Sequence, residues 1–527
     1  MVVPELRPWR AARPHVVRIA HAVRPSLARV GTTVRRSTGT GSPQVRRVSQ
    51  PKTWQFTATA ATAGLALAAG VVTAAGPWDS SGQRTAERDR AVTLEAARGT
   101  DHGSTRGNAG TPPREPRTPP SAPSVLTGLG GTATTVKSAP GGKALAAVLD
   151  PLLKDPALGR RSASVVDVAT GRRLYGTGSG DALTPASTTK IATAVAALSA
   201  MGADHRLTTR ATFEPDTKEV VLVGGGDPTL TAREKTAPGW ASLRDLADRT
   251  AAALGKRGVR QVTLSYDTTL YAGDKRHPIG VNPNIAEISP LMADEARTDD
   301  SGSGPAARVP DPAADAARTF GDLLKKHGIK ASPPGPSKSS TRASTLATVS
   351  SPPLATLVER MLTNSDNDLA EALARHTAIA TGKRADFQGA GAAVRAQLQR
   401  LKVPLKGAVF RDGSGLDRRD RLTADLLTAL LVKAADPAHP DLRPALTGLP
   451  VAGFTGTLSG RYADGAAGVV RAKTGTLTGV NTLAGTVVDK DGRLLAFAFL
   501  ATGTSSAGAA QTALDKAATA LSACGCR

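Results

Sequence analysis

The segment from Gly468 to Gly503 contains three apolar runs separated by short turns, so this end of the chain is predicted to form an antiparallel sheet. Its second turn, Asp489-Lys490-Asp491-Gly492, has the composition of a hairpin loop. Far upstream, SASVVDVATGRRLYG predicts another hairpin, with its turn at Thr170-Gly171. Apolar helical patterns lie between these strands. We therefore expect an α/β fold in which an antiparallel sheet, built from both ends of the folded region, lies beside a helical cluster.

The middle of the chain has a pattern of its own. A hairpin (RLTTRATFEPDTKEVVLVGGG) is followed by a helix near Ser242–Gly255, a strand (RQVTLSY) and a helix at about Pro312–His327. These elements predict an inserted α+β domain at residues 206–345. The insertion would divide the main domain, which carries the catalytic motifs described below, into residues 143–205 and 346–527.

The N-terminal region contains a candidate membrane segment. Residues 53–76 include no charged residue and are long enough to cross a bilayer as a helix. The preceding residues 1–52 hold ten arginines and Lys52 against a single acidic residue, Glu5. The positive-inside rule then predicts a basic cytoplasmic tail, a transmembrane anchor and an extracytoplasmic remainder. A cleaved signal segment, which would release a secreted protein, is the alternative. Residues 77–142, rich in Pro, Gly and Ser, predict a disordered linker.

Composition excludes several classes of function. A net charge of +23 would suit a nucleic-acid partner, but much of it lies in residues 1–52, aromatics are only 3% of the chain, and the sequence shows no basic helix with an aromatic platform. We expect no nucleic-acid binding. The histidines are scattered and there is no dinucleotide fingerprint, so we expect no metal and no cofactor. The only cysteines, Cys524 and Cys526, exclude a disulfide framework. Their role and the oligomeric state stay open.

Two of three short motifs bear on nucleophilic chemistry: Ser187-Thr188-Thr189-Lys190 and Ser365-Asp366-Asn367. Ser187 begins a predicted buried helix, and Lys190, three residues on, shares its face. A serine hydroxyl needs a base to become nucleophilic, and burial would lower the lysine pKa enough for that task. Ser365 could relay a proton, and the Asn367 amide could grip a substrate backbone. Taken alone, a helix cap at Ser187 and a polar turn at Ser365 are the simpler interpretations.

The third motif, Lys473-Thr474-Gly475-Thr476, lies on the first predicted strand of the C-terminal meander. Lys473 would supply positive charge, and the hydroxyls of Thr474 and Thr476 could hold a terminal carboxylate. Gly475 would leave room for substrate backbone to lie against the strand. The simpler interpretation is a strand end with an exposed lysine. The three simpler interpretations would all have to hold by chance, for three motifs in this order, so the combination favours a catalytic centre.

In this order the three motifs resemble those of active-site serine penicillin-binding proteins and serine β-lactamases. The segments VGGGDPTL (Val223–Leu230) and FRDGSGLDRRDRL (Phe410–Leu422) make the resemblance more specific. They are similar to segments of the D-alanyl-D-alanine carboxypeptidase/endopeptidase class, whose members carry a large insertion between the first two motifs. The similarity covers most of residues 143–505. It implies a serine penicillin-recognising (β-lactamase/transpeptidase-like) fold with an inserted α+β domain.

The resemblance also implies an activity. The chain would be a serine-type D-Ala-D-Ala carboxypeptidase that acts on peptidoglycan stem peptides through an acyl-enzyme on Ser187, with D,D-endopeptidase activity as an addition. Penicillins and other β-lactams would acylate it as inhibitors. Glu371 is the last glutamate of the chain, so the water-activating glutamate that common β-lactamases place before the third motif is missing. A membrane-tethered sensor without turnover is the alternative, but Lys190 beside Ser187 favours catalysis.

The resemblance further assigns substrate contacts. The backbone amides of Ser187 and Thr476 would form an oxyanion hole. Asp267 and Tyr271, within DTTLY, and Arg418 would bind the zwitterionic end of a diaminopimelate side chain, a group that calls for both a carboxylate and a cation. An ordinary surface role for these last three residues is the alternative.

Overall fold

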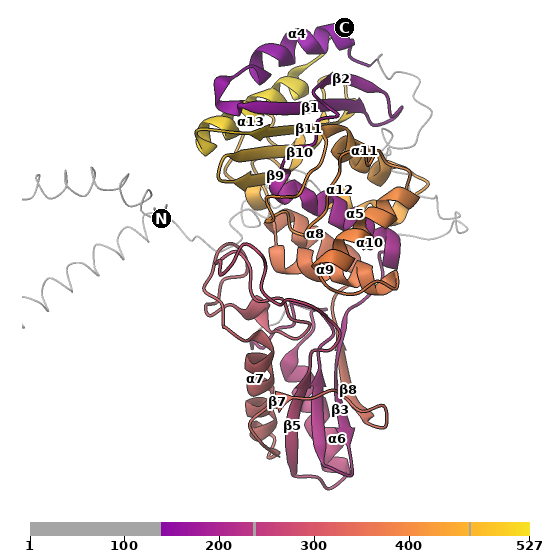
Figure 1. Cartoon of the computed structure of the whole chain (residues 1–527), viewed down its shortest axis with the longest axis vertical. Coiled ribbons are helices and arrows are strands. Elements are labelled where there is room, and N and C mark those ends of the chain that lie inside the picture. Colours follow the sequence, from indigo (N-terminus) through magenta and orange to yellow (C-terminus); the bar gives the residue numbers. More distant parts are fainter. Residues whose placement is uncertain (1–138, 235–238, 463–464, 527) are drawn as a thin grey trace, which may run out of the picture. The chain divides into compact units, whose positions relative to one another are not determined.

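The computed structural model describes residues 139–234, 239–462 and 465–526 (Figure 1). Among these residues, no helix combines the length and the apolar character needed to cross a bilayer. Three predicted segments lie wholly or almost wholly outside the described residues. They are the basic tail (1–52), the anchor or signal segment (53–76) and the linker (77–142).

A five-stranded antiparallel sheet carries the third motif. Its strands, in spatial order, are β2 (Arg173–Thr177), β1 (Arg160–Asp167), β11 (Leu494–Thr502), β10 (Val480–Val488) and β9 (Val470–Leu477). β1, from the start of the described chain, pairs with β11, from its end, with Ala163 opposite Phe499. The predicted C-terminal meander and the sheet made from both ends of the folded region are thus confirmed.

Helices cover both faces of this sheet (Figure 1). The helices are α4 (Gly142–Leu153), α5 (Thr189–Met201), α8 (Leu354–Asn364), α9 (Asn367–Ala380), α10 (Phe387–Arg400), α11 (Ala424–Ala435), α12 (Pro444–Thr447) and α13 (Ala507–Ala523), with 3-10 turns η1 (Pro156–Leu158), η2 (Ala186–Thr188), η4 (Pro440–Leu442) and η5 (Gly456–Leu458). Successive strand residues point to opposite faces. On β11, Phe497 and Phe499 therefore join the core under α4 and α13, whereas Ala498 and Leu500 join the core around α5.

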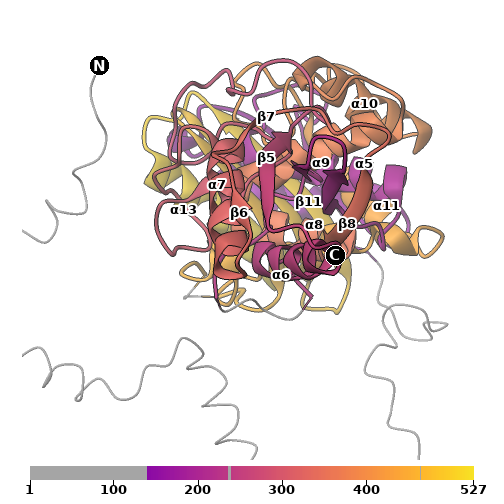
Figure 2. The same ribbon diagram turned by 90° about the horizontal axis from the view of Figure 1, so that it is seen from below.

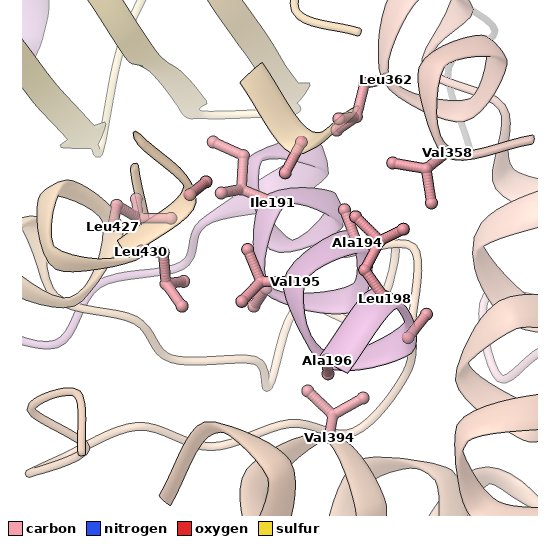
Figure 3. Close-up of a cluster of buried hydrophobic side chains, with 14 of the residues drawn as sticks. Ile191, Ala194, Val195, Ala196, Leu198, Val358, Leu362, Val394, Leu427 and Leu430 are labelled. Atoms are coloured by element: carbon pink, nitrogen blue, oxygen red, sulfur yellow. The ribbon is translucent and has the colours of Figure 1, made fainter. Parts of the chain in front are cut away.

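Helix α5 lies at the centre of the second core. Every residue from Thr189 to Leu198 is buried, as expected for a helix that is enclosed on all sides. Figure 3 shows Val195 turned toward α11 and Ala196 turned toward Val394 of α10. Because its neighbours enclose α5 on several sides, the position of its first turn is set by packing along the whole helix.

A second, six-stranded mixed sheet draws all its strands from residues 208–350. They are β6 (Lys330–Ala331), β5 (Gln261–Asp267), β4 (Glu219–Val223), β3 (Thr208–Glu214) and β8 (Ser344–Ser350), with β7 (Gly335–Pro336) beside β5. Helices α6 (Leu243–Lys256) and α7 (Pro312–Lys326) contact each other and this sheet (Figures 1 and 2), and η3 (Asp294–Ala296) follows the long segment after β5. The predicted limits of the insertion, 206 and 345, fall just before β3 and inside β8.

The cysteines, whose role the sequence left open, are joined in a disulfide between Cys524 and Cys526. Cys524 is buried in the core under α13. The carbonyl oxygen of Cys526 accepts a hydrogen bond of 2.9 Å from the backbone N–H of Gly141. The two ends of the described chain therefore meet beside α4.

Phe497→Ala tests the packing of the sheet against α4 and α13. The side chain of Phe497 is fully buried, so we expect its removal to lower the free energy of unfolding by about 3–5 kcal/mol in a urea titration. Val488→Ala, at the partly exposed end of β10, is the control and should cost about 0.5 kcal/mol or less. Equal losses for the two variants would contradict this assignment of the core.

Candidate active site

The first motif spans the turn η2 and the first turn of α5. Nζ of Lys190 lies 3.0 Å from Oγ of Ser187. Helix α5 begins at Thr189 with Thr188 in the N-cap position, so Ser187 does not occupy the place of a helix cap. The capping interpretation is therefore wrong, and the serine hydroxyl is paired with the lysine.

The amine of Lys190 is fully buried and has two further partners. It lies 2.6 Å from Oδ1 of Asn367 and 2.7 Å from the carbonyl oxygen of Ser414. Both of these oxygens can only accept. A neutral amine would donate its two protons to them, and its lone pair would be left for the proton of the Ser187 hydroxyl. The contacts are those that a general base requires.

Burial lowers the pKa of Lys190 from its ordinary value to about 8, although four nearby carboxylates oppose this shift. They belong to Asp412, Asp366, Glu371 and Asp368. A pKa near 8 leaves a useful fraction of the lysine neutral at physiological pH. Desolvation therefore outweighs the negative charge around the amine.

The second motif links two helices. Ser365 ends α8 in the left-handed conformation (φ 58°, ψ 39°), and it lines the same cavity as Ser187. Asn367 is the first residue of α9. Its Oδ1 accepts from Lys190, and its Nδ2 donates to the carbonyl oxygen of Asn284 at 2.8 Å. Protein atoms thus hold both ends of this amide, and its expected contact with a substrate backbone stays a prediction.

The third motif lies on β9, next to η2. Thr474 and Thr476 line the cavity. Lys473 is fully buried, and its Nζ donates to the carbonyl oxygen of Thr474 at 3.0 Å. Burial first, and then the positive charges of Lys190 and Arg461, hold the pKa of Lys473 well below its usual range. The simpler interpretation of an exposed lysine at a strand end is therefore wrong.

Gly475 permits β9 to approach η2 closely. A Cβ atom at this position would lie 2.1 Å from Oγ1 of Thr482 and 2.8 Å from the carbonyl oxygen of Pro185. The same two atoms form a hydrogen bond of 2.8 Å. The space that a side chain would need at Gly475 is therefore filled by protein atoms, whereas the sequence predicted room for substrate backbone there.

The three motifs meet at one cavity of about 280 Å³. The motif residues that line it are Ser187, Ser365, Asp366, Asn367, Thr474 and Thr476. The segment between β5 and α7 lines it as well, through Ile279, Asn282, Asn284, Arg297 and Arg308. The region predicted as an insertion therefore contributes directly to the site.

Sequence reasoning missed the role of Glu371. Its Oε1 accepts from the backbone N–H groups of Gly413 and Ser414, each at 3.0 Å, and its Oε2 pairs with Arg375 at 3.2 Å. The glutamate thereby holds the turn whose Ser414 carbonyl contacts Lys190. A signal was present, because an acidic residue four positions after Asn367 must have partners if it is buried.

The residues expected to bind diaminopimelate are engaged elsewhere and do not line the cavity. The carboxylate of Asp267 accepts from the backbone N–H groups of Thr269 and Ser339. The hydroxyl of Tyr271 donates to the carbonyl oxygen of Gly226 at 3.3 Å. The exposed Arg418 donates to the carbonyl oxygen of Thr478 at 2.8 Å, just beyond β9.

Two groups of side chains in the described residues are close enough to share a metal ion. They are His277, Glu371 and Asp412, and Glu295, Asp366 and Asp368. Protein donors already engage both groups: His277 pairs with Asp412 and Arg375 with Glu371 in the first, and Arg308 pairs with Asp368 and Arg360 contacts Glu295 in the second. We therefore treat both groups as hydrogen-bond networks.

Gly475→Ala tests the contact between β9 and η2. Because the added methyl group would displace Pro185 or Thr482, we expect Ser187 to shift and to react with a labelled penicillin about a hundredfold more slowly. Gly180→Ala is the control, since a Cβ there meets no atom within 4 Å. An unchanged reaction rate in Gly475→Ala would show that the contact does not position the serine.

Comparison with known proteins agrees with this geometry. The sequence profile of the D-Ala-D-Ala carboxypeptidase 3 (S13) family matches residues 145–301 and 297–523. Carboxypeptidase DacB of Mycolicibacterium smegmatis is 38% identical over 405 residues, which is 73% of this chain and 85% of that protein. A carboxypeptidase of Mycobacterium tuberculosis is 35% identical over 406 residues, 74% of this chain and 86% of that protein.

Among solved structures, penicillin-binding protein 4 of Haemophilus influenzae superposes with a TM-score of 0.58 and 21% identity, covering 70% of this chain and 97% of that one. A complex of the same protein with a β-lactam superposes with a TM-score of 0.53 and 23% identity. The predicted penicillin-recognising fold is thereby confirmed. From the family profile and the related carboxypeptidases, the chain belongs to the D-Ala-D-Ala carboxypeptidase 3 (S13) family.

Proposed function

We propose that this protein is a serine D-Ala-D-Ala carboxypeptidase that acts on the stem peptides of peptidoglycan. The observation that carries the proposal is the fully buried Lys190 amine, 3.0 Å from the Ser187 hydroxyl in a cavity shared by the three motifs. Membership of the carboxypeptidase family supports the reaction and the substrate class. A sensor without turnover would need no desolvated base beside its serine.

The reaction begins when Oγ of Ser187 attacks the carbonyl carbon of the penultimate D-alanine, while Lys190 takes the hydroxyl proton. The negative charge on the carbonyl oxygen is stabilised by the backbone N–H groups of Ser187 and Thr476 and by the helix N-terminus behind Ser187. The C–N bond then breaks, and the leaving D-alanine receives the proton from Lys190 by way of Ser365. Water attacks the resulting ester, releases the shortened peptide and restores the serine.

Substrate binding uses the strand side of the cavity. The hydroxyls of Thr474 and Thr476 bind the terminal carboxylate, and Lys473 lies fully buried beside them on β9. A carboxylate at this position marks the peptide end. The assignment of Asp267, Tyr271 and Arg418 to a diaminopimelate pocket stays a prediction, and their observed partners do not support it.

Penicillins react with the same serine, and their adduct hydrolyses slowly. Glu371, the glutamate nearest to the site in sequence, is fully buried, holds two backbone N–H groups and pairs with Arg375. With its oxygens occupied, it is unsuited to activate a water molecule. β-Lactams therefore act as long-lived inhibitors.

The same acyl-enzyme serves D,D-endopeptidase cleavage, in which the leaving amine belongs to a second stem peptide. We include this activity in the proposal, since the two reactions differ only in the leaving group. The substrate places the protein outside the cytoplasm. Residues 53–76 would hold it at the membrane, or would be cleaved as a signal segment.

Ser187→Ala tests the nucleophile. The wild-type protein should form a covalent adduct with a labelled penicillin that persists for hours, and it should release D-alanine from a pentapeptide ending in D-Ala-D-Ala. The variant should do neither, because no oxygen remains to form the ester. Intact-mass spectrometry and a D-alanine assay give the two readouts. An adduct on the variant would place the nucleophile elsewhere.

The pH dependence of acylation tests the base. Lys190 acts only when neutral, so the acylation rate should rise with pH, level off above the lysine pKa of about 8 and fall about tenfold for each pH unit below it. We would measure it from pH 5.5 to 9.5 with a labelled penicillin. Lys190→Arg keeps a positive charge but cannot serve as a base, and it should abolish acylation across this range. A flat wild-type profile would rule out Lys190 as the base.

A further inference from the structure

His277 connects the segment between β5 and α7 to the catalytic centre. Its side chain is fully buried, and its Nε2 lies 2.9 Å from Oδ2 of Asp412, which is equally buried. The backbone N–H of Ile279 donates to Nδ1 at 3.1 Å. Because Nδ1 accepts, the ring proton is assigned to Nε2, which donates it to Asp412. The imidazole thus has one defined orientation between the cavity wall and the catalytic domain.

Asp412 organises the turn that follows it. Its Oδ1 accepts from the backbone N–H of Gly415 at 2.7 Å, and its Oδ2 accepts from the backbone N–H of Asp417 at 2.7 Å. The hydroxyl of Ser414 donates to the same Oδ2 at 3.2 Å. Burial would raise the pKa of Asp412, but the hydrogen bond from His277 and the other donors hold that pKa far below its usual value. Asp412 is therefore an ionised carboxylate that these hydrogen-bond donors stabilise.

This turn contacts the base and the residue before the nucleophile directly. The carbonyl oxygen of Ser414 accepts from Nζ of Lys190 at 2.7 Å. A Cβ at Gly415, whose φ is +82°, would lie 1.9 Å from the carbonyl oxygen of Ala186. The turn is therefore packed against the residue that precedes Ser187, and a small displacement of it would move the lysine's acceptor.

We infer that His277 is a positioning residue for the reaction: through Asp412 it fixes the turn whose Ser414 carbonyl orients the Lys190 amine. The inference rests on the proposed function and adds to it a role for the inserted region beyond lining the cavity. His277 touches neither the nucleophile nor the base. Its effect passes through two hydrogen bonds. Nε2 of His277 donates to Asp412, and Nζ of Lys190 donates to the carbonyl oxygen of Ser414.

The test compares His277→Gln with His277→Asn in the full chain. The glutamine amide reaches about as far from Cβ as Nε2 of histidine and can donate to Asp412, whereas the asparagine amide is too short. We would separate the first-order acylation constant for a labelled penicillin from its dissociation constant. The glutamine variant should keep the acylation constant within about threefold. The asparagine variant should lose about tenfold to a hundredfold, the range for a hydrogen bond to a charged group, with the dissociation constant changed less than about twofold.

Two controls separate positioning from general stability. Arg276→Ala removes the neighbouring, exposed side chain that pairs with Glu287, and it should leave acylation unchanged. Phe320→Leu loosens the core of the inserted region; it should lower the melting temperature without changing the acylation constant.

Equal acylation constants for the glutamine and asparagine variants would overturn the inference. The inference would also be overturned if Phe320→Leu and His277→Asn had the same melting temperature and lost the same factor in the acylation constant. If wild-type protein formed no adduct at Ser187, the proposed function itself would fail, and this result is distinct from either of the others.

Discussion

The burial of the Lys190 amine is the constraint on which the rest of the site depends. An ammonium ion removed from water at this depth loses its hydration, so the protein must supply polar partners. They come from three separate segments: η2, the first residue of α9, and the turn after Phe410. Helices α5 and α9 pack in the core around α5, and Phe410 packs against it. If one of them moved, a buried polar group would lose its partner, which costs more than the loss of a surface contact. Catalytic geometry and helical packing therefore stabilise each other.

The negative charge around this amine has to be balanced, because it would otherwise keep a proton on the lysine. Four carboxylates oppose the downward shift of the Lys190 pKa. Two of them are compensated from the inserted region: Arg308 pairs with Asp368, and His277 donates to Asp412. With this balance, desolvation still determines the direction of the shift, and the pKa of Lys190 falls to about 8. The inserted region thus lines the cavity and also influences the electrostatics of the base.

How well the sequence predicts this arrangement depends on the range of the interaction. The three apolar runs that form β9 to β11 and the three-residue spacing of Ser187 and Lys190 involve neighbours within one hairpin or one helical turn, and the predicted meander and the contact between the two side chains are confirmed. The contact of Lys190 with Ser414 could not be predicted in this way, because a backbone carbonyl has no residue-specific signal. From the sequence, Glu371 shows only that no glutamate follows it before the third motif. Its role in holding a distant turn emerges only when α9 and that turn are seen together.

The residue before the nucleophile shows where the fold stores strain. Ala186 has φ of +49°, a conformation that costs an alanine about 1 kcal/mol or more. It persists because both of its sides are closed: Gly415 and Gly475 approach so closely that a Cβ on either would collide with this turn. Pro185 is fixed as well, since its carbonyl oxygen accepts from the hydroxyls of Thr188 and Thr482. The turn cannot relax without breaking these contacts, so the Ser187 hydroxyl is directed at Lys190 before any substrate enters. The reactivity of the serine therefore depends on two glycines that carry no chemistry, and of these only Gly475 belongs to one of the three motifs.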